Sequence, residues 1–226
     1  MANKIYLVIG NKNYSSWSMR PWILLKYFKI PFQEIFIQLY EGNYKEQLLK
    51  YSPSGKVPAL VHGSLHVSES LAICEYIADL YPKKTIWPSK KGDRAWARSI
   101  SAEMHAGFIK IRRGMPMNIR GSYPGKGRTP EVDMDIKRIV EIWTECRKTF
   151  KKKGPFLFGH FTVADAMFLP VVTRFRTYGV ETSGLAAEYV QTMLNLPEFK
   201  EWEKAGIKEP WFIKASEIYN PKYQSK

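Results

Sequence analysis

Ser15-Ser16-Trp17-Ser18-Met19-Arg20 is the stretch that decides the fold, because it joins the apolar run Ile5 to Ile9 to a helical pattern. That run is typical of a strand covered on both faces. A helix is predicted from about Ser18 to Phe28, since Pro21 falls in its first turn, where a missing N–H costs nothing. An inward stripe follows along this helix: Trp22, Leu25 and Phe28. Phe32 to Leu39 (FQEIFIQL) predicts a second strand and completes a βαβ unit.

The next elements outward are a hairpin and a third helix. Val57 to Val61 and Leu65 to Ser68 flank the turn His62-Gly63-Ser64, which predicts two antiparallel strands. Ser70 to Tyr81 has the apolar spacing of a helix. The order is therefore βαβ, a connection, then ββα, which is the order of an α/β thioredoxin-like fold.

Everything after about residue 93 has helical periodicity, and this change of period predicts two domains. We predict a thioredoxin-like domain over residues 1–82, a linker over residues 83–92 (KKTIWPSKKG) and an all-α helical bundle over residues 93–226. The predicted helices of the bundle span residues 93–113, 131–150, 186–196 and 198–205, with another that begins near Thr162. Thr162-Val163-Ala164-Asp165 has the spacing of a capping box, and residues 219–226 are expected to form a surface arm.

Composition narrows the class of protein. Of 226 residues, 45% are hydrophobic, which is enough to oppose the chain entropy of folding. Cys74 and Cys146 lie far apart without a zinc-ligand spacing, so neither a disulfide framework nor a metal site is expected. The opening residues MANKIYLVIG hold an apolar run too short for a signal peptide or a membrane span. We therefore expect a cytoplasmic protein with no membrane partner.

The net charge is +14, from 35 Lys and Arg against 21 Asp and Glu. Such a charge attracts nucleic acid, acidic membrane surfaces and small anions alike, so its sign alone does not choose a partner. The cluster Lys151 to Lys153 is most simply a solvated helix end. Because the chain has no RNP sequence, zinc ligands or helix-turn-helix pattern, nucleic acid is not the expected partner.

Four segments match one family in order and spacing over nearly the whole chain: Ser15 to Arg20, Lys56-Val57-Pro58, Glu69-Ser70 and Phe161 to Asp165. They resemble the cytosolic glutathione transferases. The first is most similar to the serine-dependent zeta and tau classes, which have a serine five residues before an arginine. The second and third resemble the tau pattern, with glutamate-serine thirteen residues after a basic residue. The resemblance implies a serine-type member of bacterial type.

Two departures limit what the resemblance implies. Trp17 stands where zeta-class members have a cysteine, so their isomerase activity on maleylacetoacetate does not carry over. Omega-like members have a cysteine at the head of the first helix, where this chain has serines. Thiol-disulfide exchange through a protein cysteine is therefore not expected.

The resemblance implies that Ser15 activates the thiol of glutathione, the co-substrate. A thiol with a pKa near 8.5 is only about 3% ionised at pH 7, so a nucleophilic thiolate must be stabilised. A hydroxyl donor at a helix N-terminus supplies such stabilisation. The alternatives left open are that Ser15 only caps the helix and that Ser16 is the donor.

Other residues of the motifs are expected to hold the tripeptide. Ser70 would bind the γ-glutamyl carboxylate, Glu69 its ammonium group, and Lys56 a ligand carboxylate. Val57 would pair with the cysteinyl backbone as an added strand. The predicted glutathione-binding set is completed by Ser16 and Trp17. By residue chemistry alone, Glu69 is also a favourable acid at a helix start, and Pro58 an ordinary strand-initiating proline.

The second substrate is expected between the domains, against the first helix of the bundle. Its predicted pocket consists of Met104, His105, Phe108, Arg112 and Met115. In beta-class relatives a histidine comparable to His105 approaches the glutathione sulphur, whereas a lone histidine is more often structural. The main hypothesis is a homodimeric detoxification enzyme in which the thiolate attacks an apolar electrophile. The alternative is a non-catalytic module of the same fold that binds ligands or proteins.

Overall fold

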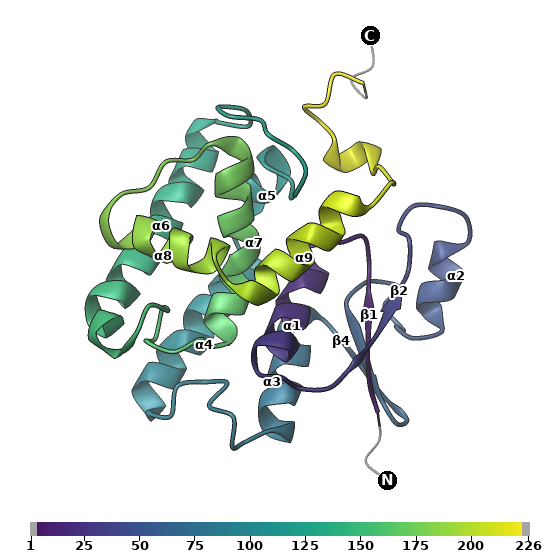
Figure 1. Ribbon diagram of the computed structural model, residues 1–226, viewed down its shortest axis with the longest axis horizontal. Coiled ribbons are helices and arrows are strands. Elements are labelled where there is room, and N and C mark those ends of the chain that lie inside the picture. The colour runs from purple at the N-terminus through teal and green to yellow at the C-terminus, as the bar shows by residue number, and fades with distance from the viewer. Residues whose placement is uncertain (1–3, 223–226) are drawn as a thin grey trace.

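Four strands form a mixed sheet in the first half of the chain (Figure 1). The structure is a computed structural model that describes residues 4–222. The strand order is β2-β1-β3-β4, with β2 parallel to β1 and the other two pairs antiparallel. The elements of this half are β1 (Ile5–Ile9), α1 (Ser16–Tyr27), β2 (Gln33–Phe36), α2 (Tyr44–Leu49), β3 (Ala59–His62), β4 (Leu65–Ser68) and α3 (Ser70–Leu80).

The central strand β1 is apolar throughout because helices cover both faces of the sheet. Leu7 and Ile9 are fully buried in the cluster that includes the inward side chains of α1 and α3. Val8 points to the opposite face and packs near Leu48 of α2. Figure 1 shows α2 on the side of the sheet away from the other helices. The predicted thioredoxin-like order is confirmed, with α2 inserted in the connection.

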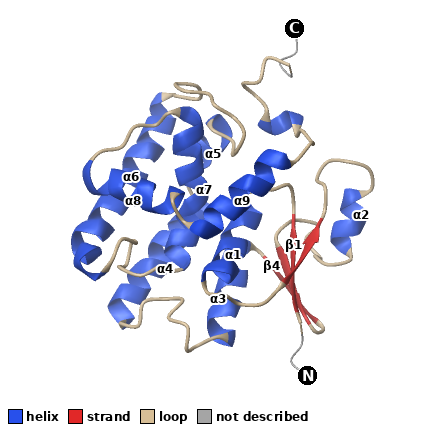
Figure 2. Ribbon diagram, in the orientation of Figure 1, coloured by secondary structure: helices blue, strands red, loops and turns tan. Residues whose placement is uncertain are grey.

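The second half of the described chain is helical (Figure 2). Its helices are α4 (Lys91–Ala106), α5 (Ile109–Gly114), α6 (Pro130–Phe150), α7 (Val163–Tyr178), α8 (Gly184–Leu194) and α9 (Pro197–Lys208), with short 3₁₀ turns at Lys151–Lys153 and Lys214–Ser216. The prediction of an all-helical second half is confirmed. The exact domain limits at residues 82 and 93 stay predictions.

One hydrophobic core joins the two halves through α1. Helix α1 packs against α3, α7 and α9. Its Tyr27 stacks on Phe161, with ring centroids 4.1 Å apart, and its Trp22 meets Trp202 of α9 edge-on at 5.1 Å. Aromatic pairs of this kind add about 0.5–1.5 kcal/mol beyond the area that they bury. The position of α1 is therefore set from both halves.

The predicted helix over residues 93–113 is two helices instead of one. Helix α4 ends at Ala106, and Phe108 takes a left-handed conformation with φ 57° before α5 begins. A Cβ atom on Gly107 would lie 2.8 Å from the carbonyl oxygen of Glu103, so glycine is needed at this sharp end. The guanidinium of Arg112 donates to the Gly107 carbonyl at 3.0 Å and caps the end of α4.

Other boundaries differ from the predictions by a few residues. Helix α2 was not predicted, because its six residues contribute only one buried side chain, Leu48. Strand β2 is shorter than Phe32 to Leu39. Residue Tyr219 of the predicted surface arm is instead anchored, since its hydroxyl donates to the Gly114 carbonyl at 2.8 Å. Residues 223–226 of that arm lie outside the described residues.

Asp165 closes the predicted capping box at the start of α7. Its carboxylate accepts the backbone N–H of Thr162 at 2.8 Å and that of Leu157 at 3.0 Å. The side chain is fully buried. Burial raises the pKa of Asp165 to about 6, against the opposing effect of these hydrogen bonds.

This raised pKa predicts a pH-dependent contribution to stability. The contribution of Asp165 is present below about pH 4 and is lost as the pH rises through about 6, because the folded state holds the proton more tightly. Relative to Asp165→Asn, the free energy of unfolding of the wild type should fall by about 2–3 kcal/mol between pH 4 and 7. Urea unfolding at a series of pH values measures it. Asp79→Asn, at an exposed position of α3, should track the wild type, and a parallel Asp165→Asn curve would refute the assignment.

Candidate active site at the head of helix α1

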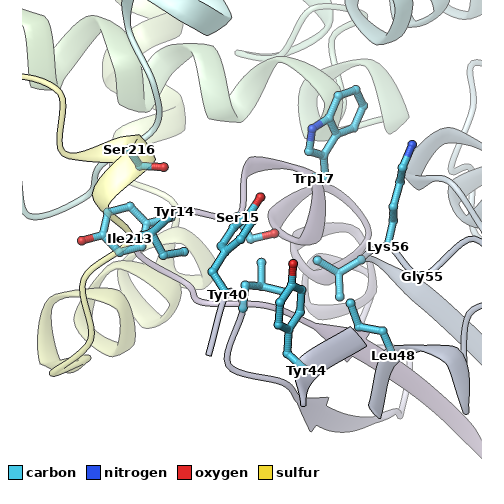
Figure 3. Close-up of a pocket in the computed structure, with 12 residues that line it drawn as sticks. Tyr14, Ser15, Trp17, Tyr40, Tyr44, Leu48, Gly55, Lys56, Ile213 and Ser216 are labelled. Atoms are coloured by element: carbon cyan, nitrogen blue, oxygen red, sulfur yellow. The ribbon is translucent and has the colours of Figure 1, made fainter. Parts of the chain in front are cut away.

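A cavity of about 400 Å³ opens at the N-terminus of α1 (Figure 3). Its walls come from three parts of the chain: the head of α1, the segment around α2, and the C-terminal segment after α9. The lining residues are Tyr14, Ser15, Trp17, Leu39, Tyr40, Tyr44, Leu48, Gly55, Lys56, Val57, Ile213 and Ser216. Figure 3 shows Ser15 in the middle, with Trp17 and Lys56 on one side and Ile213 and Ser216 on the other.

Ser15 is the N-cap of α1 and also a wall of this cavity. Its hydroxyl oxygen accepts the backbone N–H of Ser18 at 3.3 Å, and the hydroxyl donates to the Ser18 hydroxyl oxygen at 2.7 Å. The same oxygen of Ser18 accepts the Gly10 N–H at 3.2 Å. Ser15 therefore lies at the positive end of the helix dipole, with its hydroxyl proton directed at Ser18.

Ser16 has a different environment. It is buried, and its hydroxyl oxygen lies 3.4 Å from a guanidinium nitrogen of Arg174 on α7. It is absent from the residues that line the cavity. Of the two serines, Ser15 is the one that the structure places against the cavity.

Trp17 lies beneath two guanidinium groups. The guanidinium carbons of Arg20 and Arg112 stand 4.3 and 4.8 Å from the ring centroid. The ring of His105 approaches Trp17 edge-on at 5.3 Å. Cation–π contacts fix the indole. Burial and the neighbouring arginines Arg112 and Arg174 lower the pKa of Arg20.

Glu69 and Ser70 stand at the start of α3. Glu69 lines a second cavity of about 390 Å³, together with Trp17, Lys56, Val57 and Pro58, whereas Ser70 is not among its lining residues. Glu69 has φ 70° and ψ 128°, a left-handed φ that costs a non-glycine residue about 1–3 kcal/mol. Ser70 is fully buried, and its hydroxyl oxygen accepts a hydrogen bond from Arg20 at 3.3 Å. Because Arg20 occupies an acceptor lone pair, the Ser70 hydroxyl is left to act as a donor.

Comparison with known proteins identifies the family. The models of the N-terminal and C-terminal domains of glutathione S-transferases match residues 14–80 and 129–205. Glutathione S-transferase U8 of Arabidopsis thaliana is 42% identical over 201 residues, which cover 84% of this chain and 80% of that protein. The chain belongs to the glutathione S-transferase family. This membership gives it glutathione transferase activity, with glutathione as co-substrate.

Solved structures of other glutathione transferases share the fold. A homologue from Burkholderia, with bound glutathione, matches with a TM-score of 0.68 at 20% identity, over 90% of this chain and 98% of that one. A tau-class enzyme from mango, Mangifera indica, matches with a TM-score of 0.66 at 22% identity, over 95% and 96% of the two chains. At these identities the likeness concerns the fold.

The residues predicted to bind the second substrate are spread between core and site in this transferase. Met104, Phe108 and Met115 are at most 8% exposed and belong to the hydrophobic core instead. Met104 lies on the buried face of α4, and Phe108 lies in the break between α4 and α5. His105 and Arg112 lie beside Trp17, at the edge of the site.

Several cavity residues were not predicted. Tyr14 precedes the motif serine, Tyr40 and Tyr44 flank the start of α2, and Ile213 and Ser216 follow α9. The Ile213 segment is about two hundred residues from Ser15 in sequence and carries no motif. The aromatic residues Tyr40 and Tyr44, four positions apart in the sequence, were the one local signal that could have indicated a binding surface.

Cysteines and potential metal ligands are two further kinds of chemical group within the described part of the transferase. Among residues 4–222, no three His, Cys, Asp or Glu side chains gather as metal ligands. Cys74 and Cys146 are both buried free thiols, and burial raises the pKa of each to about 12. No helix within the same residues is long and apolar enough to cross a membrane.

The charges around His105 predict how it titrates. Burial, Arg20 and Arg112 lower its pKa, whereas Glu69, 3.7 Å away, opposes them. We expect an NMR titration midpoint below 6.5, and Glu69→Gln should lower it further. Glu103→Gln is the control, because Glu103 lies on the same helix but pairs with Arg138. Equal shifts in the two variants, or a midpoint above 6.5, would contradict this account.

Proposed function

We propose that this transferase binds glutathione across the heads of α1 and α3, ionises its thiol beside Ser15, and conjugates it to an apolar electrophile. The observation that carries the proposal is the position of Ser15, which combines the N-cap of α1 with the wall of a cavity. The cavity is floored by apolar and aromatic side chains, and Lys56 lies at its edge. This arrangement suits an anionic tripeptide beside an apolar acceptor.

The γ-glutamyl end of glutathione binds at the start of α3. The Ser70 hydroxyl donates to the ligand carboxylate, and the Glu69 carboxylate accepts from its ammonium group. The proposal is supported by the hydrogen bond from Arg20, which leaves Ser70 as a donor, and by the left-handed φ of Glu69. Strained backbone of this kind clusters at ligand sites.

The rest of the tripeptide runs from the second cavity, beside Glu69, to the first cavity, beside Ser15. The backbone of Val57, directly before β3, pairs with the cysteinyl unit as an added strand. Lys56 attracts a ligand carboxylate, and Trp17 covers the peptide from above. These three residues line both cavities, which supports a ligand that runs through the two. Ser16 contributes indirectly, through its contact with Arg174 of α7 at the N-terminus of α1.

Ser15 stabilises the thiolate by a hydrogen bond from its hydroxyl, which turns away from Ser18 when the ligand binds. Lowering a thiol pKa from 8.5 to 6.5 requires about 2.7 kcal/mol. A charge-assisted hydrogen bond supplies about 1.5–3 kcal/mol, and the helix dipole adds about 0.3–1 kcal/mol. The two effects together are of the required size.

Ser15→Ala is the direct test. It should raise the pKa of the bound glutathione thiol by about 1–2 units and lower turnover at pH 7 about tenfold or more, with partial recovery at higher pH. The ultraviolet absorbance of the thiolate, titrated in the complex, measures the pKa. Ser15→Thr keeps both the cap and the hydroxyl and should stay near the wild type. Ser16→Ala is the matched control, and unchanged thiol pKa and turnover in Ser15→Ala would show that Ser15 is a cap alone.

We also propose that the transferase is a homodimer that detoxifies electrophiles in the cytoplasm. Members of the family pair the region around α3 with the C-terminal half of a second copy. Leu65 of β4 and Leu80 of α3 are 43% and 37% exposed, which supports such a contact. Two free, buried cysteines suit a reducing compartment.

Sedimentation tests the dimer. At micromolar concentration the mass should be near twice the 26.3 kDa of one chain. Leu65→Lys should shift it towards one chain by placing a charge in the interface, whereas Leu49→Lys, at an exposed position of α2, should not. A wild-type mass near 26.3 kDa would overturn the proposal.

A further inference from the structure

Glu217 is a buried carboxylate that the proposed chemistry does not use. It is 2% exposed, although it lies close to the C-terminal end of the described chain. One of its oxygens accepts a hydrogen bond from the Tyr14 hydroxyl, and the other accepts from Tyr123 at 3.1 Å and from the Asn220 amide at 3.1 Å. A buried charge with this many donors is held in one place.

Tyr14 is the residue directly before Ser15, so Glu217 joins the C-terminal segment to the site. Burial and the nearby Glu217 raise the pKa of the Tyr14 hydroxyl to about 12. The phenol therefore remains a donor, and it also accepts from Arg120 at 2.9 Å. Because its proton is directed at Glu217, Tyr14 is not available as the donor to the thiolate.

A second glutamate fixes the other end of the same segment. Glu209 accepts the backbone N–H groups of Lys12 at 2.6 Å and Asn13 at 3.1 Å. Arg120 donates to the carbonyl of Trp211 at 2.7 Å. The stretch Glu209–Glu217 is thus tied at both ends to the three residues that precede Ser15.

Between these ties the segment supplies one wall of the cavity. Ile213 and Ser216 line it from the side opposite Trp17 and Lys56 (Figure 3). Ile213 is 6% exposed. The width of the gap in front of Ser15 therefore depends on where the segment is held.

We propose that Glu217 is a specificity-determining positioning residue, which fixes the Ile213 wall through Tyr14 and so restricts the acceptor to small, flat aromatic electrophiles. The inference rests on the proposed conjugation activity. The acceptor class follows from the lining, which combines tyrosine rings with aliphatic side chains, among them Tyr44 and Ile213. Without the carboxylate, the wall is free to move outward and larger acceptors gain access.

The test compares two acceptors in Glu217→Ala. Chlorodinitrobenzene has one ring and nitroquinoline oxide has two fused rings. The ratio of kcat/KM for the larger acceptor to that for the smaller should rise about tenfold, mainly through a higher KM for chlorodinitrobenzene. The calorimetric Kd of glutathione should change less than about twofold, because its proposed contacts lie on the other side of Ser15.

Matched variants separate positioning from general destabilisation. Glu217→Gln keeps one acceptor for Tyr14 and should lie between Glu217→Ala and the wild type. Tyr14→Phe removes the donor and should shift the ratio in the same direction. The shift in the double variant should be much smaller than the sum of the two single shifts. Glu188→Ala, at an exposed position of α8, should leave the ratio unchanged.

Hydrogen exchange of the backbone amides of residues 211–217 gives a readout that needs no activity. Exchange should be faster in Glu217→Ala than in the wild type. Unchanged exchange, or faster exchange with an unchanged acceptor ratio, would overturn the proposal. A wild type that neither binds glutathione nor conjugates either acceptor would instead defeat the proposed function, and exchange would then still test whether Glu217 holds the segment.

Discussion

The burial of α1 is the constraint on which the rest of the structure depends. The helix lies between α3, α7 and α9, and aromatic pairs fix it from both halves of the chain. The N-terminus of α1 is the end that meets a cavity, through Ser15 and Trp17. The backbone dipole of a helix held this rigidly is already oriented when a negative charge forms beside it, so that only the Ser15 hydroxyl has to turn.

Two buried arginines near this end have no carboxylate among their hydrogen-bond partners, which suits the anionic ligand that we propose. Arg20 and Arg174 are fully or almost fully buried and are bonded to hydroxyl and carbonyl oxygens, not to carboxylates. Nearby Glu69 is exposed. Buried cations without a carboxylate are costly, and a ligand with carboxylates and a thiolate reduces that cost.

Local patterns in the sequence predicted the elements that we propose to hold glutathione, and long-range packing decided the rest of the site. Ser15, Glu69 and the hairpin before α3 are signalled by caps, turns and short spacings, which act within a few residues. The break after α4 depends on the end of that helix being capped by Arg112, and the Ile213 wall depends on a glutamate that meets Tyr14 across the molecule. Neither the break nor the wall is signalled by a hydrophobic period or a sequence motif, so neither was predicted.

The two sides of the proposed site are therefore built from different kinds of interaction. The proposed glutathione side is built from backbone ends and caps within the first seventy residues. The proposed acceptor side is closed by a segment after α9 that is held by side-chain hydrogen bonds, among them those of Glu209, Glu217 and Arg120. Side-chain ties can change one at a time without unfolding the sheet. The fold can therefore keep one nucleophile while the acceptor that it meets varies.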